Sequence, residues 1–187
     1  MAEKTRRIAP ATLLMLLAVA SFAAATVTVT NITRWTIKAE YPPIVKYAGD
    51  DAATGWVIVS KDESGNVNRT TITLYGFKGD PTYYSSVLKI CLNTTVAGNK
   101  AFNIGLVWNG TVSGNWTYVD YVKLWINKTI GPMVIKSDGA SPTTIGYLTL
   151  SGSQCAVVSA EVLVKPNAPT DQELVTFEIN VVAKHPP

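Results

Sequence analysis

Apolar and polar residues alternate with a period of two through much of this 187-residue chain. A clear example runs from Leu174 to Lys184, where Thr176 and Glu178 lie between apolar neighbours. The apolar positions of this segment are Val175, Phe177, Ile179, Val181 and Ala183. Successive side chains of a strand point to opposite faces, so this pattern favours strands with one buried face. After residue 25, no stretch of ten residues has convincing helical periodicity.

Turn residues divide the alternating segments into short strands. Strands are expected at residues 26–40, 44–47, 56–60, 70–77, 87–92, 101–108, 116–126, 133–136, 145–150, 154–165 and 174–184. The preceding residues 83–86 are open to strand or helix. Asn109-Gly110 and Ser137-Asp138-Gly139 are expected to be turns. The pattern predicts an all-β fold, a jelly-roll or immunoglobulin-like β-sandwich of about nine to eleven strands.

The N-terminal segment 1–25 has the features of a cleaved signal peptide. Lys4, Arg6 and Arg7 precede an apolar run, and Ala23-Ala24-Ala25 has the small residues that signal peptidase prefers. A retained membrane anchor is the alternative, but the apolar run is shorter than the roughly 20 residues of a bilayer span. Cleavage after Ala25 would leave a single domain, residues 26–187, with a net charge of +1 out of the +3 of the whole chain. No basic stripe suited to nucleic acid is present in the sequence.

The two cysteines, Cys91 and Cys155, are expected to form a disulfide. An even number of cysteines in an exported protein favours pairing, with two buried thiols as the alternative. The bond would close a loop of about 64 residues and remove roughly 4 kcal/mol of chain entropy from the unfolded state.

Six Asn-x-Thr triplets are present where the asparagine, serine and threonine content would give about two by chance. This excess predicts covalent N-glycans and an extracellular location for an archaeal or eukaryotic product. The alternative is that threonine-rich strands and asparagine-rich turns create the pattern by themselves. The triplets begin at Asn31, Asn68, Asn93, Asn109, Asn115 and Asn127.

The sequence gives no set of residues for catalysis, so no enzymatic activity and no cofactor are expected. His185 is the sole histidine and lies at the C-terminus. Asp50-Asp51 could bind Ca²⁺, but a solvated turn is the commoner structure for such a pair. Glu161 is expected to point outward from its strand. The five tryptophans favour core packing over stacking on sugars.

The segment Thr26–Glu40 is expected to be a long strand that begins at the processed N-terminus. A strand with a free end can complete the sheet of a neighbouring subunit through main-chain hydrogen bonds and alternating apolar anchors. Because that contact is head-to-tail, it generates a filament. The residues assigned to this donor strand, of about 26–39, are Thr26, Val27, Thr28, Val29, Thr30, Ile32, Trp35 and Ile37.

This layout resembles the camelysin/TasA-like biofilm fibre proteins and the archaeal bundling pilins related to them. The matching features are the signal ending at Ala25, the strand Thr26–Glu40, the Tyr41-Pro42-Pro43-Ile44 break and an all-β remainder. The resemblance implies a pilus or biofilm fibre subunit that polymerises with copies of itself by donor-strand complementation at the cell surface. The alternative is a secreted monomeric β-domain that binds glycans or surfaces.

Overall fold

The computed structural model describes residues 36–38, 41–62 and 69–186. The chain divides into two compact units, residues 1–39 and 40–187. The expected signal peptide lies outside the described residues, as does nearly all of the expected donor strand. Of that strand only residues 36–38 are described, and no strand is assigned to them.

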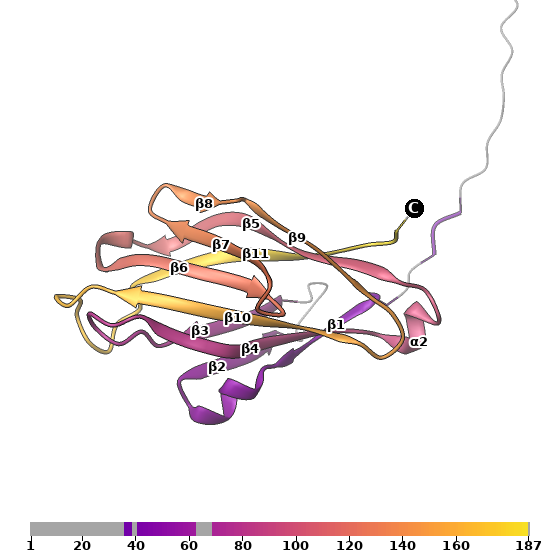
Figure 1. The fold of residues 1–187 in the computed structure, drawn as a ribbon, viewed down its shortest axis with the longest axis horizontal. Coiled ribbons are helices and arrows are strands. Elements are labelled where there is room, and N and C mark those ends of the chain that lie inside the picture. The colour runs from indigo at the N-terminus through magenta and orange to yellow at the C-terminus, as the bar shows by residue number, and fades with distance from the viewer. Residues whose placement is uncertain (1–35, 39–40, 63–68, 187) are drawn as a thin grey trace, which may run out of the picture. The chain divides into compact units, whose positions relative to one another are not determined.

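The described part of unit 40–187 is an all-β fold of eleven strands with three short helical segments (Figure 1). The strands are β1 (Ile44–Ala48), β2 (Val57–Asp62), β3 (Arg69–Leu74), β4 (Thr82–Leu92), β5 (Phe102–Gly114), β6 (Val119–Ile126), β7 (Ile130–Lys136), β8 (Gly139–Ser141), β9 (Thr144–Leu150), β10 (Cys155–Val164) and β11 (Val175–Lys184). The 3-10 helices η1 (Asp50–Thr54) and η2 (Trp116–Tyr118) and the helix α2 (Thr94–Ala97) connect them. The all-β prediction is confirmed.

Three antiparallel sheets build the fold. The largest has six strands in the order β1-β4-β10-β6-β7-β8. The two smaller sheets are β11-β5-β9 and the hairpin β2-β3. In Figure 1 the hairpin and β11 lie behind β4, β10 and β6, and apolar residues of all three sheets join one core. The arrangement is therefore sandwich-like, with one continuous layer and a second layer in two pieces.

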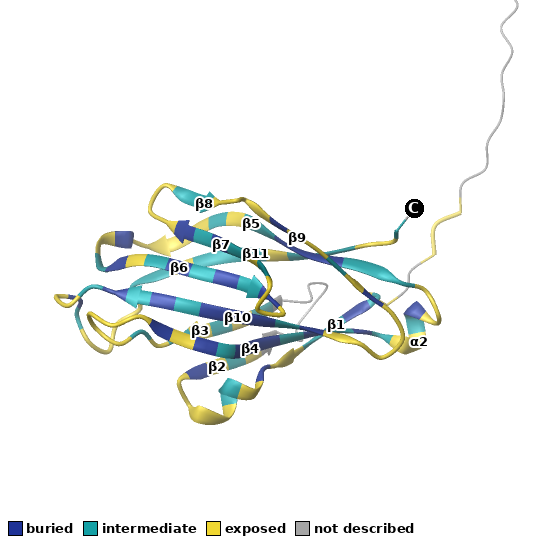
Figure 2. Ribbon diagram, in the orientation of Figure 1, coloured by how far each residue is buried: buried dark blue, intermediate teal, exposed yellow. Residues whose placement is uncertain are grey.

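The six-stranded sheet carries most of the fully buried side chains, as Figure 2 shows along β4, β10 and β6. In β10 alternate residues are buried because every second side chain of a strand faces the core. This regular burial follows from the alternation in the sequence. The fully buried large side chains of the six-stranded sheet include Ile90, Ile126, Met133 and Ile135.

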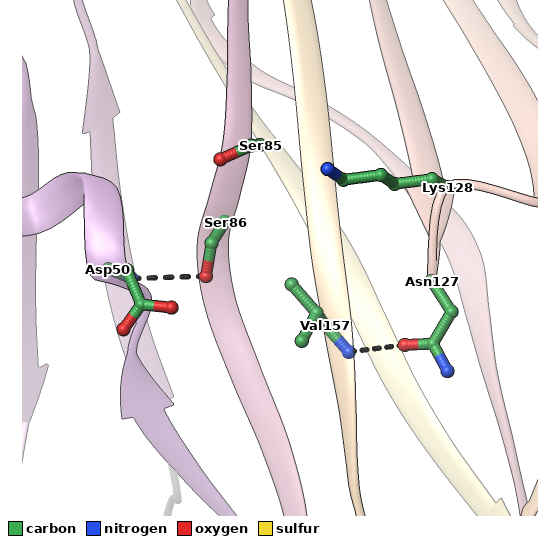
Figure 3. Close-up of a pocket in the computed structure, with 6 residues that line it drawn as sticks. All are labelled: Asp50, Ser85, Ser86, Asn127, Lys128 and Val157. Carbon is green, nitrogen blue, oxygen red and sulfur yellow. Dashed lines mark hydrogen bonds between the residues drawn. The ribbon is translucent and has the colours of Figure 1, made fainter.

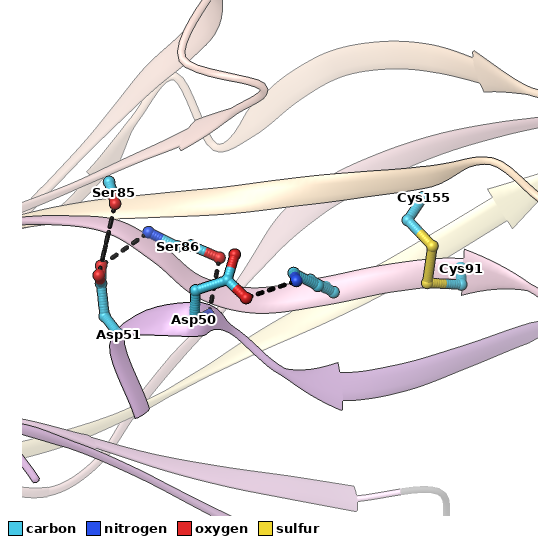
Figure 4. Close-up of polar contacts among 7 residues, drawn as sticks. Asp50, Asp51, Ser85, Ser86, Cys91 and Cys155 are labelled. Carbon is cyan, nitrogen blue, oxygen red and sulfur yellow. Dashed lines mark hydrogen bonds and ion pairs between the residues drawn. A yellow bond between two sulfur atoms is a disulfide. The ribbon is translucent and has the colours of Figure 1, made fainter. Parts of the chain in front are cut away.

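The predicted disulfide is confirmed. Cys91 on β4 and Cys155 on β10 are directly opposite in the antiparallel register, with their Cα atoms 4.0 Å apart (Figure 4). The bond therefore links two neighbouring strands of the largest sheet across 64 residues of sequence.

Some local predictions were wrong. Asn109-Gly110 is not a turn, because β5 continues through it to Gly114 while pairing with β11. The ladder absorbs the extra residues as bulges, and Gly110 adopts a positive φ of 114° there. Gly139, expected in a turn, begins the short strand β8. Residues 83–86 belong to strand β4, which settles the choice that the sequence left open.

Candidate assembly surface

Among the described residues, four strands of the second layer have one edge without a partner, namely β2, β3, β9 and β11. In this part of the chain β3 pairs with β2 alone, and β11 pairs with β5 alone. Each edge strand leaves one row of main-chain N–H and C=O groups outside a ladder. Such an edge is a template for pairing with a further strand.

Apolar side chains on these edge strands are only partly buried although they contact the core. This holds for Ile72 and Leu74 on β3 and for five residues of β11. In the facing sheet the core-facing side chains of β10 are buried almost completely. The core is therefore less completely covered at β3 and β11 than at β10. The five residues of β11 are Val175, Phe177, Ile179, Val181 and Ala183. We call these residues of β3 and β11, together with the open edges of these two strands, the assembly surface.

The segment after β3 is held tightly against β10. A Cβ on Gly76 would overlap the Val164 side chain, so only glycine fits where the chain crosses there. The amide of Gly79 donates to the carbonyl of Val164 at 2.8 Å, and Lys78 Nζ donates to the carbonyl of Ala168 at 2.9 Å. These bonds fix one end of the β2-β3 hairpin relative to the six-stranded sheet.

The chain enters β1 through Pro42-Pro43, and this entry point is held by Asn93. The amide of Asn93 donates to the carbonyl of Pro43 at 2.9 Å, and its Nδ2 donates to the carbonyl of Pro42 at 3.4 Å. Prolines cannot extend a ladder through their own nitrogen, so the predicted break before β1 is consistent with these contacts. These two bonds therefore hold the chain in place at Pro42-Pro43, where it enters the domain.

The acidic pair of η1 is used within the fold (Figure 4). Asp51 Oδ2 accepts from the amide of Ser86 at 2.8 Å, and the amide of Asp50 donates to Ser86 Oγ at 3.0 Å. The Asp50 carboxylate pairs with Lys89 at 2.6 Å, and that hydrogen bond lowers the pKa of Asp50. Within the described residues, no three His, Cys, Asp or Glu side chains gather where they could hold a metal ion.

Glu161 lies on the outer side of the six-stranded sheet, as the sequence predicted. Its Oε1 accepts from Lys123 Nζ and from Tyr121 Oη, both at 2.8 Å. The bond from Lys123 lowers the pKa of Glu161, and the bond to Glu161 raises the pKa of Lys123. Burial and the same carboxylate raise the pKa of Tyr121. The carboxylate is thereby held as an ion in a surface network.

The tryptophans differ in burial, which the prediction of core packing did not anticipate. Trp116 is buried, whereas Trp56 is 48% exposed and contacts the rings of Tyr75 and Phe77 edge-to-face. Tyr75 and Phe77 are 43% and 50% exposed, so the three rings form an aromatic cluster open to solvent. Because Trp56 and Tyr75 flank the paired strands β2 and β3, only the pairing brings them together, and no local motif marks them. Trp35 lies outside the described residues.

The predicted donor-strand residues and sequon asparagines differ in whether the structure describes them. Thr26, Val27, Thr28, Val29, Thr30, Ile32 and Trp35 of the donor strand lie outside the described residues, while Ile37 is described and in no strand. Asn31 and Asn68 also lie outside them. Of the other four sequon asparagines, Asn109 in β5, Asn115 before η2 and Asn127 after β6 are exposed, and Asn93 before α2 is partly buried. None of these four lies on β3 or β11, although Asn109 Nδ2 donates to Glu178 of β11 at 2.8 Å.

Among the described residues, no helix is both long and apolar enough to cross a membrane. His185 contacts the ring of Phe102 edge-to-face at a centroid distance of 5.6 Å. Comparison with models of known protein families finds no match, and comparison with curated protein sequences finds none either.

Proposed function

We propose that this protein is the subunit of an extracellular pilus or biofilm fibre. In this proposal the mature N-terminal strand, about residues 26–39, of one subunit completes the second layer of the next. The observation that supports it best is the assembly surface, where partly buried apolar residues lie beside the free edges of β3 and β11. The layout that resembles biofilm fibre proteins points in the same direction.

A donated strand would satisfy both needs of the assembly surface. Its main-chain groups would pair with an open edge, and its alternate apolar residues, beginning with Val27 and Val29, would cover the half-buried core. Fully burying an exposed aliphatic or aromatic side chain contributes about 1.5–3 kcal/mol, so finishing several half-buried ones contributes several kcal/mol. The contact joins different surfaces of two subunits and therefore continues as a filament.

Export provides the control over when assembly begins. While the signal peptide is attached, the strand is held at the membrane, and cleavage after Ala25 frees its end. The disulfide between Cys91 and Cys155 suits an oxidising extracellular location.

Removing the donor strand tests the proposal directly. A variant lacking Thr26–Thr30 should be exported as a folded, disulfide-bonded monomer that forms no filaments under electron microscopy. A matched pair of variants sharpens this test: V27D/V29D charges the apolar face of the strand, and T28D/T30D places the same charges on the opposite face. Only the first should abolish filaments. Filaments that persist without Thr26–Thr30 would refute the proposal.

A second candidate function is glycan binding by a secreted monomer. The solvent-open cluster of Trp56, Tyr75 and Phe77 favours it, because exposed aromatic faces stack on sugar rings. Sedimentation of the mature protein with insoluble polysaccharides measures this function. Binding by a stable monomer that W56A abolishes would establish it, whereas a concentration-dependent polymer without such binding would reject it.

A further inference from the structure

The hydrogen bonds of the four described sequon asparagines fix which atom of each side-chain amide is held by the fold. A backbone N–H can only donate, so Asn115 and Asn127 accept through Oδ1, each from a backbone amide at 2.8 Å. A carbonyl or carboxylate oxygen can only accept, so Asn93 and Asn109 donate through Nδ2. An N-glycan is attached through Nδ2, and the four sites therefore divide into two pairs.

The β6–β7 turn presents Asn127 with its amide nitrogen outward. Its Oδ1 accepts from the amide of Val157 on β10, and Figure 3 shows Nδ2 pointing away from Val157 and from the other residues drawn. All three residues of the triplet, Asn127, Lys128 and Thr129, are exposed and form the turn itself. A transferase can therefore reach the nitrogen and the threonine of this triplet at the surface of the folded domain.

Asn115 also holds its oxygen and leaves its nitrogen unengaged. The side chain caps η2 by accepting from the amide of Thr117, two residues on, and both residues are exposed. Asn115 Nδ2 makes no hydrogen bond to a described residue. Trp116 between them is buried, and its Nε1 donates to Thr111 Oγ1 at 3.2 Å. The fold thus anchors this triplet by its middle residue while its first and third residues face solvent.

Asn109 differs because its nitrogen is engaged and its triplet belongs to a sheet. Asn109 Nδ2 donates to Glu178 Oε2 at 2.8 Å, a hydrogen bond to a charged acceptor. Gly110 pairs with Glu178 and Thr111 pairs with Phe177, so the backbone of the triplet is fixed in the β5–β11 ladder. A transferase would have to displace the carboxylate and open the ladder before this nitrogen could react.

Asn93 is engaged through three of its groups. Its Nδ2 donates to the carbonyl of Pro42 at 3.4 Å, and its backbone amide donates to the carbonyl of Pro43 at 2.9 Å. Its carbonyl accepts from the amides of Val96 and Ala97 at 3.0 and 2.7 Å, which begins α2. The residue is also partly buried. Its amide therefore cannot turn outward without giving up the contact with Pro42, and its triplet cannot straighten without unwinding α2.

We propose that the folded domain accepts N-glycans at Asn115 and Asn127. Asn93 and Asn109 stay unmodified for as long as the domain is folded. The donor is a lipid-linked sugar whose C1 carries a phosphate or diphosphate, and the catalyst is a glycosyltransferase of the exporting cell. A bond forms between Nδ2 and the sugar C1, and the bond from C1 to the phosphate oxygen breaks. The phosphate leaves with the electron pair, and Nδ2 loses one proton. The bonds from backbone amides to Oδ1 are kept, so the fold need not open at either site.

The test compares the folded chain with the same triplets outside the fold. The mature chain, made without sugars and oxidised to its disulfide, is incubated with membranes of the exporting cell, which supply the transferase and the lipid-linked sugar. Four peptides with one triplet each, residues 92–99, 106–113, 112–119 and 124–131, are incubated in the same way. Mass spectrometry of glycopeptides measures the occupancy of each site. Dividing the occupancy in the folded chain by that in the peptide removes the preference of the transferase for particular sequences.

This ratio of folded to peptide occupancy should be near one for Asn115 and Asn127. It should be at least about tenfold lower for Asn93 and Asn109, because their reaction waits on local opening of the fold. Equal ratios at all four sites would overturn the proposal. So would a peptide of Asn93 or Asn109 that is itself unmodified, since the sequence and not the fold would then exclude the site.

Two variants of β11 test the part played by Glu178. E178L removes the acceptor of Asn109 Nδ2 and should raise the ratio at Asn109 severalfold, since only the ladder then protects the triplet. T176L places the same side chain two residues away on the same face of β11 and keeps the Asn109 bond, so the ratio should not change. An unchanged ratio in E178L, or an equal rise in T176L, would overturn the role given to Glu178.

Discussion

Cys91 and Cys155 face each other across the β4–β10 ladder, and their bond joins the second and third strands of the six-stranded sheet. The two strands pair over most of their length, from Cys155 opposite Cys91 to Val162 opposite Thr82. The disulfide lies at one end of this pairing. It therefore fixes the register of two long strands that are far apart in the sequence.

Removing this disulfide should lower stability without changing the fold. In the chain-entropy model a closed loop of 64 residues contributes about 4 kcal/mol, so C91S/C155S should unfold at a markedly lower denaturant concentration than the oxidised wild type. Circular dichroism at each denaturant concentration measures this. The reduced wild type serves as the control and should coincide with the variant. Equal midpoints for the oxidised and reduced wild type would contradict the prediction.

Gly49→Ala should destabilise the junction between β1 and η1. An added Cβ would overlap the backbone carbonyl of Ser86, and neither backbone segment can move without breaking the Asp50–Ser86 contacts. Overpacking of this kind costs about 1–3 kcal/mol. Gly146→Ala is the matched control, because its Cβ would meet only the Ile130 side chain at an ordinary 3.6 Å. Thermal unfolding should distinguish the two, and equal effects would show that the junction can rearrange.

Glu161 should contribute stability that depends on pH. Its pKa is lowered in the folded state, chiefly by the hydrogen bond from Lys123. The contribution is therefore fully present above the ordinary glutamate pKa of about 4.3 and is lost as pH falls through the lowered value. The difference in unfolding midpoint between wild type and E161Q should shrink on acidification through this range. NMR titration of the carboxyl carbon should give a pKa that K123M raises, and an unchanged pKa in K123M would contradict the assigned cause.

Intersubunit cross-linking should locate the receiving strands in filaments of the proposed kind. With cysteines at Val29 and Ile179, or at Val29 and Leu74, oxidised filaments should give covalent ladders on denaturing gels. Thr149→Cys combined with Val29→Cys is the control, because Thr149 is exposed on β9, at the opposite edge of the three-stranded sheet from β11. Ladders from the control pair alone would place the donated strand elsewhere.

The sequence predicted the strands well because burial in this fold follows alternation. In β10 and β11 the apolar positions that alternate in the sequence are those that contact the core. The disulfide was predictable from the number of cysteines and the expected export alone. The local geometry near Asn109 was not predictable, because pairing with β11 overrides the turn preference of Asn-Gly.

The candidate surfaces depend on strand order, and strand order cannot be read from the alternation. The second layer forms as two separate sheets, and β3 and β11 each lie at an edge of one of them. The aromatic cluster at Trp56 likewise depends on the β2–β3 register.

The bonds from Asn93 to Pro42 and Pro43 fix the point at which the N-terminal segment joins the domain. Sixteen residues, 26–41, precede Pro42 in the expected mature chain, and fully extended they would reach about 55 Å. In a filament of the proposed kind, the segment would therefore act as a spacer of set length. Two residues inserted after Lys38 would lengthen the axial repeat by about 7 Å and keep the apolar face in phase, whereas one residue would rotate that face away from its receiving groove.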